Sequence, residues 1–195
     1  MSSRTFALER KTNETQIAVR VDLDGAGAAR VATGLGFLDH LLTAIARHAR
    51  IDLELEARGD LEVDDHHTAE DSALALGAAI DGALGEREGI ARFGDAHAPL
   101  DEALARAVID LSGRPYAAVA LDLARPSIGD VAAENVVHLF RSLAVALRAT
   151  LHLDVLRGDN DHHKAEAAAK ALALALRAAL ARTGGGVPST KGVIP

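Results

Sequence analysis

The chain has 195 residues, of which 49% are hydrophobic and 25% charged, and its net charge is −7 at pH 7. These values are typical of a globular protein, and the lack of a basic run argues against a nucleic-acid or anionic-membrane partner. Cysteine is absent, which excludes disulfides and thiolate ligands, so a bound metal would need histidine, aspartate or glutamate. We find neither the apolar core of a signal peptide nor an apolar run of membrane length, and we expect a single cytoplasmic domain, residues 1–195.

The predicted elements of the first half begin with a strand at 16–22, where apolar and polar residues alternate. Asp24 and Gly25 follow and are typical of a hairpin turn. Helical spacing predicts a helix over 37–49, with a buried stripe of Leu38, Leu41, Leu42, Ile45 and Ala49. A second alternating strand at 51–60 and a second helix at 66–84 complete this half.

The second half repeats this order. Two short strands are expected around the Ser-Gly-Arg-Pro turn within 105–124, then a helix at 134–152, a strand at 151–160 and a helix at 162–182. The helix at 134–152 places Val136, Phe140, Leu143 and Leu147 on one face. Residues 89–103, rich in glycine and proline signals, are expected to link the halves.

The repeated order predicts an α+β fold made by tandem duplication of a strand–strand–helix–strand–helix half-domain. We expect repeats at about 1–93 and 94–183, helices packed with two sheets, and a flexible C-terminal tail at 184–195.

Each half carries the motif His-His-x-x-Glu at the head of its second helix: His66, His67 and Glu70, then His162, His163 and Glu166. A histidine in the preceding helix, His40 or His138, stands at a similar distance before each copy. Residues four apart share a helix face, whereas adjacent residues point about 100° apart. We therefore predict two metal centres of three histidines and one glutamate each, in which every motif lends its other histidine to the second ion.

A single such motif would more often be a solvent-facing pair, but duplication favours metal binding. The ligand types admit manganese, iron, zinc, cobalt or nickel without choosing among them. Asp65 and Asp161, beside the histidine pairs, are expected either to orient imidazoles or to favour the helix N-termini. His48, His97 and His152 are interpreted as structural.

Two other motifs have simpler explanations. The segment VDLDGAG (21–27) is similar to the Asp-x-Asp-Gly loop of certain phosphatases, but a hairpin turn explains it better. The Gly-x-Gly of TGLG lacks the rest of a dinucleotide fingerprint and fits a loop before a helix.

The motifs TGLGFLDHLL, GDLEVDDHHTAED, GIARFG, DLSGRPY, TLHLDVLRGDNDHH and PSTKG occur in this order. Together they resemble the imidazoleglycerol-phosphate dehydratase family, hydro-lyases of histidine biosynthesis, from RTFALERKTNET to the tail. Ala169 and Leu139 depart from the aromatic residues common in the family, and both concern packing rather than chemistry.

The resemblance implies dehydration of D-erythro-imidazole glycerol phosphate to imidazole acetol phosphate with two Mn²⁺ ions per active site. It implies these metal ligands: His40, His66, His67, Glu70, His138, His162, His163 and Glu166. It also implies that Glu14 contacts the substrate diol as the acid/base, that Arg92, Arg114, Ser189 and Lys191 surround the phosphate, and that twenty-four subunits form a hollow shell with metal sites at subunit boundaries. We expect the reaction to use a metal-bound imidazolate and a diazafulvene-type intermediate.

Two rival interpretations are a hydrolase with a dinuclear site and a metal-dependent structural shell without catalysis. Hydrolytic dinuclear sites use bridging carboxylates, whereas here histidines outnumber acids among the candidate ligands. The shell predicts no role for Glu14, Arg92 or Lys191. The tail, flexible by composition, is expected to close over the phosphate through Lys191.

Overall fold

The computed structural model describes residues 3–194. Its elements, in chain order, are β1 (Thr5–Lys11), β2 (Thr15–Asp22), β3 (Ala29–Ala32), α1 (Gly36–Ala49), β4 (Asp52–Gly59), α2 (His66–Leu84), β5 (Phe93–Leu100), β6 (Ala103–Asp110), β7 (Tyr116–Ala120), β8 (Ser127–Ile128), β9 (Val131–Ala132), α3 (Ala133–Ala146), β10 (Thr150–Arg157) and α4 (Asp161–Leu180).

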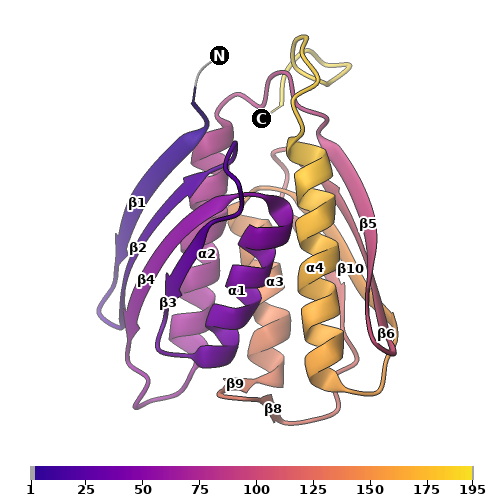
Figure 1. Ribbon diagram of the computed structural model, residues 1–195. Helices are drawn as coiled ribbons and strands as arrows, with labels where there is room; N and C mark the ends of the chain where they lie inside the picture. Colours follow the sequence, from indigo (N-terminus) through magenta and orange to yellow (C-terminus); the bar gives the residue numbers. More distant parts are fainter. Residues whose placement is uncertain (1–2, 195) are drawn as a thin grey trace.

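Two four-stranded sheets form the outer layers, and the helices lie between them (Figure 1). The first sheet has the order β1-β2-β4-β3 and the second has the order β5-β6-β10-β7. In each sheet the first three strands pair antiparallel, and the last strand, β3 or β7, pairs in parallel with its neighbour. This shared topology confirms the α+β class and is consistent with a tandem duplication.

The helices of one half pack against helices of the other half. α1 contacts α4, and α2 contacts α3, while α2 also lies on β1 and β2 and α4 on β5 and β6. Every residue of the two predicted stripes is at most 4% exposed, so both stripes are buried as expected. The helix pairing brings side chains from distant parts of the sequence together.

The first sheet begins with a strand that the sequence did not predict. β1 pairs with β2 through a turn at residues 12–14, and β2 then pairs with β4 rather than with the segment after Asp24 and Gly25. The prediction of a hairpin at Asp24 and Gly25 was wrong, because a turn signal does not determine which strand the chain reaches next. Here the turn is followed by residues 26–28, whose backbone N–H groups donate to the Asp52 carboxylate, and β3 then joins β4 in parallel.

The second sheet also begins with an unpredicted strand. β5 occupies residues expected to link the halves and pairs with β6 along its whole length. It contains Pro99, which an edge strand accommodates because its outer side makes no ladder hydrogen bonds. The proline and glycine signals therefore mark an edge strand, and each half begins with a hairpin.

α3 ends six residues before the predicted boundary at 152. Arg148 has a φ of 53°, in the left-handed region, which stops the helix and turns the chain into β10. Arg50, with a φ of 59°, does the same between α1 and β4. The apolar periodicity continues through this turn and into the strand, so it did not reveal the boundary.

Small residues allow the layers to approach closely. A Cβ atom added at Gly94 on β5 would lie 2.0 Å from the carbonyl oxygen of Ala175 on α4. A Cβ added at Gly77 on α2 would lie 2.6 Å from the carbonyl oxygen of Leu143 on α3. None of the helices formed by residues 3–194 combines the length and the apolarity needed to cross a membrane.

Candidate functional site

Two groups of histidine and glutamate side chains lie where helices of different halves meet. In each group the candidate ligand atoms lie within 4.8 Å of one another. The groups are His66, Glu70 and His138 between α2 and α3, and His40, His162 and Glu166 between α1 and α4. Each motif thus combines with the helical histidine of the opposite half, because the helices pair across the duplication.

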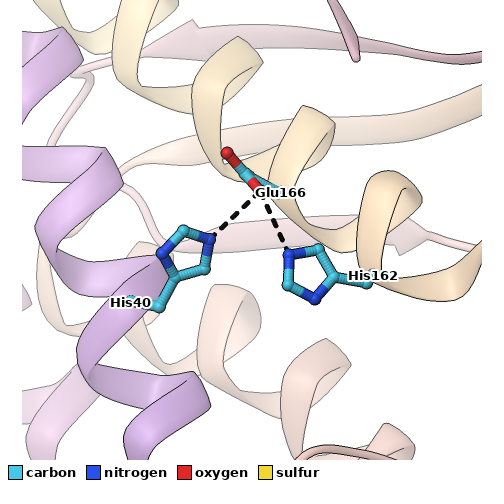
Figure 2. Close-up of side chains that lie close together, drawn as sticks. All are labelled: His40, His162 and Glu166. Atoms are coloured by element: carbon cyan, nitrogen blue, oxygen red, sulfur yellow. Dashed lines mark hydrogen bonds and ion pairs between the residues drawn. The ribbon is translucent and has the colours of Figure 1, made fainter. Parts of the chain in front are cut away.

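Glu166 is the centre of the α1–α4 group. Its Oε2 lies 3.1 Å from Nε2 of His40 and 3.2 Å from Nε2 of His162 (Figure 2). Its other oxygen lies 2.8 Å from Nζ of Lys170. Burial raises the pKa of Glu166, but the hydrogen bonds and charges of Lys170 and His40 outweigh burial and lower this pKa to about 2. Glu166 is therefore an anion at neutral pH, as a metal ligand must be.

Glu70 has the same place in the α2–α3 group. Its Oε1 lies 3.0 Å from Nε2 of His138, and its Oε2 lies 3.6 Å from Nε2 of His66. The two histidine rings are stacked, with centroids 5.1 Å apart. Four residues after Glu70 the chain has Leu74, whereas Lys170 stands four residues after Glu166. The two groups share their ligand types and differ in charge.

The first histidine of each motif is held by a residue of the opposite half. Nδ1 of His66 lies 2.8 Å from Oδ1 of Asn135 on α3, so its N–H can donate to the amide oxygen and leave Nε2 facing Glu70. His162 instead packs against Phe37 on α1, with ring centroids 5.1 Å apart. One ring is held by a hydrogen bond and the other by aromatic packing.

The second histidine of each motif lies outside both groups. Nδ1 of His67 is 3.0 Å from the Asp60 carboxylate, and Nδ1 of His163 is 2.7 Å from the Glu102 carboxylate. These hydrogen bonds raise the pKa of His67 and the pKa of His163. Within one chain, therefore, each motif contributes its first histidine and its glutamate to one group, and its second histidine points elsewhere.

Glu14, the predicted acid/base, lies beside the first motif. It stands in the turn between β1 and β2, and its carboxylate is 3.7 Å from Nε2 of His67. Its side chain is 53% exposed, so the carboxylate is accessible to a small molecule. Sequence spacing alone did not place it there, because the β1–β2 hairpin was not predicted.

The predicted phosphate contacts lie at the other end of the chain's helical layer. The backbone N–H of Arg92 donates to the carbonyl of Ala179, near the end of α4, whereas the second motif begins this helix. Figure 1 shows the tail beside the C-terminal end of α4, opposite the end where α4 begins. The guanidinium of Arg92 donates to Asp110 at 2.7 Å and to the carbonyl of Pro188 at 2.8 Å.

The other predicted phosphate contacts lie at this same end. The carbonyl of Arg114 accepts from the Thr150 hydroxyl at the start of β10, and Ser189 accepts from the backbone N–H of Lys191 within the tail. The structure thus does not bring Arg92, Arg114, Ser189 and Lys191 to the two histidine groups within a single chain.

The carboxylates of Asp65 and Asp161 accept hydrogen bonds from backbone N–H groups and not from imidazoles. Asp65 accepts from the N–H of Ala132, and Asp161 accepts from the N–H groups of residues 124 and 125. Of the two explanations left open for these residues, orientation of the imidazoles finds no contact in the described part of the chain, because both carboxylates accept backbone N–H groups instead. His48 lies beside the α1–α4 group, where burial and the positive charge of Lys170 lower its pKa.

Several residues of the site were missed by the sequence analysis: Phe37, Asp60, Glu102, Asn135 and Lys170. A signal for Lys170 was present, because it stands four residues after Glu166 on the same helix face. Glu102 stands immediately before β6 as Glu14 stands immediately before β2, and this equivalence becomes visible only when the β5–β6 hairpin is known.

Curated relatives match almost all of this chain. An imidazoleglycerol-phosphate dehydratase of Phytophthora nicotianae is 57% identical over 98% of the chain and 42% of that relative, so the chain spans less than half of its length. The dehydratase of Phaffia rhodozyma is 54% identical over 98% of the chain and 96% of that relative.

Solved structures agree with the sequence relatives. An imidazoleglycerol-phosphate dehydratase from Staphylococcus aureus superposes with a TM-score of 0.83 at 35% identity, covering 92% of this chain and 99% of that one. The Pyrococcus furiosus structure in complex with (S)-C348 has a TM-score of 0.81 at 37% identity, covering 95% and 99%. The family model for imidazoleglycerol-phosphate dehydratase matches residues 33–176, and the chain belongs to this family.

Proposed function

We propose that this chain dehydrates D-erythro-imidazole glycerol phosphate to imidazole acetol phosphate in histidine biosynthesis, with two Mn²⁺ ions per active site. The observation that carries the proposal is the convergence of each His-His-x-x-Glu motif with a histidine of the opposite half. Family membership gives the reaction class, and the histidine groups give it a chemical basis.

The donor atoms suit divalent metal ions. Each group offers two imidazole nitrogens and one carboxylate oxygen, a set that Mn²⁺ accepts along with other first-row ions. With His67 or His163 of another copy as a fourth protein ligand, an ion that prefers six ligands keeps coordination positions for a substrate. Bound in these groups, divalent ions would hold the nitrogens of the substrate's imidazole ring and stabilise negative charge on the ring.

The chain's own residues must then move protons. The carbon–hydrogen bond to be broken is not acidic, so the ring first loses its N–H proton, and hydroxide then leaves from the carbon next to the ring and produces a neutral diazafulvene. Removal of the proton from the following carbon and return of a proton to the ring nitrogen give an enol, which tautomerises to the ketone, and one water is lost in total. Glu14 is the residue we assign to this proton transfer, because its carboxylate is exposed and lies 3.7 Å from Nε2 of His67.

The complete site requires several copies of the chain, which we propose form a shell of twenty-four. His67 and His163 point away from the two groups, and α4, with 20 residues or about 30 Å of helix, separates the second motif from the tail. A substrate held at the histidines of one copy would therefore meet Arg92, Arg114, Ser189 and Lys191 of another. In such an assembly the histidine groups of one copy would lie next to the predicted phosphate contacts of another, although the two sets lie at opposite ends of the helical layer within one copy.

The experiment is turnover of imidazole glycerol phosphate by the purified full chain. We expect the ketone product with Mn²⁺, and we expect chelation to abolish both turnover and the large particle. Glu14→Gln should keep the bound metal and the particle but lower kcat about 100-fold or more. Glu86→Gln, at an exposed position outside the site, is the matched control.

Two results would contradict the proposal. One is the absence of product from fully metal-loaded protein, and the other is a wild-type rate for Glu14→Gln. The second result, with an intact particle, would favour the structural-shell interpretation.

A further inference from the structure

The two halves carry equivalent glutamates in their hairpin turns, and these glutamates have different surroundings. Glu14 immediately precedes β2 in the turn after β1, and Glu102 immediately precedes β6 in the turn after β5. Glu14 lies near His67, and Glu102 lies near His163, the second histidines of the two motifs. Duplication alone would give both glutamates one role.

Glu102 is fully engaged. Its Oε1 accepts the backbone N–H groups of Asp159 and Asn160, at 3.1 and 2.8 Å, and fixes the loop before α4. Its Oε2 lies 2.7 Å from Nδ1 of His163. A carboxylate accepts and does not donate, so this contact places the ring proton on Nδ1 and leaves the lone pair on Nε2.

In the first half Asp60, and not Glu14, contacts Nδ1 of the second histidine. Both oxygens of Asp60 lie close to Nδ1 of His67, at 3.2 and 3.0 Å. Asp60 ends an Arg-Gly-Asp segment, residues 58–60, and the same three residues recur at 157–159, so Asp159 stands at the equivalent position. Asp159 is exposed, and the contact with Nδ1 of His163 comes instead from Glu102, which also accepts the backbone N–H of Asp159. The second half thus uses its turn glutamate where the first half uses Asp60.

We propose that Asp60 and Glu102 are positioning residues that set the tautomers of His67 and His163 and present Nε2 of each ring as a metal ligand. Because Asp60 holds His67, Glu14 is available for proton transfer, whereas Glu102 is not. The inference rests on the proposed function, because it assigns both histidines to metal centres.

The test is a double-mutant cycle on Mn²⁺ affinity. In Glu102→Gln the oxygen can still accept the two backbone N–H groups, which leaves the amide NH₂ facing Nδ1 of His163 and favours the wrong tautomer. We expect a loss of affinity of about 10- to 100-fold with an unfolding midpoint close to wild type. In the His163→Ala background Glu102→Gln should lower the Mn²⁺ affinity by less than about twofold, because a residue that acts through His163 then has no ring to position. Glu86→Gln is again the control.

Wild-type affinity for Glu102→Gln, or an equal loss in both backgrounds, would overturn the inference. If Glu102→Gln does not fold, Asp60→Ala with His67→Ala provides the same cycle, since the Asp60 side chain holds His67 and does not cap the loop. Wild-type turnover measured on the same preparations separates the two proposals. A wild type without product would overturn the dehydratase proposal, while the cycle would still decide the roles of Glu102 and Asp60.

Discussion

Asn135→Leu should weaken one metal centre and spare the other. Asn135 is 5% exposed, and its Oδ1 lies 2.8 Å from Nδ1 of His66. Leucine has a similar volume, so the packing of α3 should survive, but the N–H of His66 loses its acceptor. In the metal-free chain the ring can move its proton to Nε2, whereas metal binding requires Nε2 to be unprotonated. The penalty therefore falls on the metal-bound form.

An unpaired donor costs about 1–3 kcal/mol when it is fully buried, and the side chain of His66 is 42% exposed, so we expect the low end of this range, a loss of affinity of about 5- to 10-fold at this centre. The assay is a Mn²⁺ titration that resolves two classes of site. The α1–α4 class, whose His162 is packed against Phe37, should keep its wild-type affinity and serve as the internal control. Two unchanged classes, or two classes weakened equally, would refute the reasoning.

Three further changes test an ion pair, the packing of β5 on α4, and the C-terminal tail. Asp24→Asn removes the ion pairs with Arg182 and Arg4, which lower the pKa of Asp24 from its ordinary 3.8. A depressed pKa stabilises the fold above pH 3.8, so the variant should lose about 1 kcal/mol or less at pH 7, and urea unfolding should show this difference shrinking as the pH falls below 3.8. Gly94→Ala should lower the free energy of unfolding by about 1–3 kcal/mol or more. Gly186→Ala, whose Cβ would meet open space, should leave the free energy of unfolding unchanged. Equal effects of the two changes would argue against tight packing of β5 on α4. Truncation after Gly186 should raise KM for the substrate with bound metal unchanged, and unchanged kinetics would reject closure of the tail.

Local periodicity was sufficient to predict where the helices lie, apart from the end of α3, and which residues of each motif share a helix face. α2 begins and ends where the sequence predicts. The first histidine and the glutamate of each motif belong to the same group of candidate ligands, as predicted. Both results depend only on residues a few positions apart, which helical geometry places directly.

Contacts between distant segments could not be predicted in this way. The association of His40 with α4, and of His138 with α2, depends on helix pairing across the duplication. The strand β5 was missed because its Pro99 and Gly94 are tolerated at a sheet edge and against α4, which the sequence does not reveal. Without β5, the equivalence of Glu14 and Glu102 was hidden as well.

We propose that each His-His-x-x-Glu motif binds one divalent ion together with a histidine of the opposite half. Anomalous scattering at the manganese edge, from crystals loaded with Mn²⁺, locates such ions directly. We expect two peaks per chain, one contacting His40, His162 and Glu166 and the other contacting His66, Glu70 and His138. A loaded crystal in which either group carries no peak would contradict it.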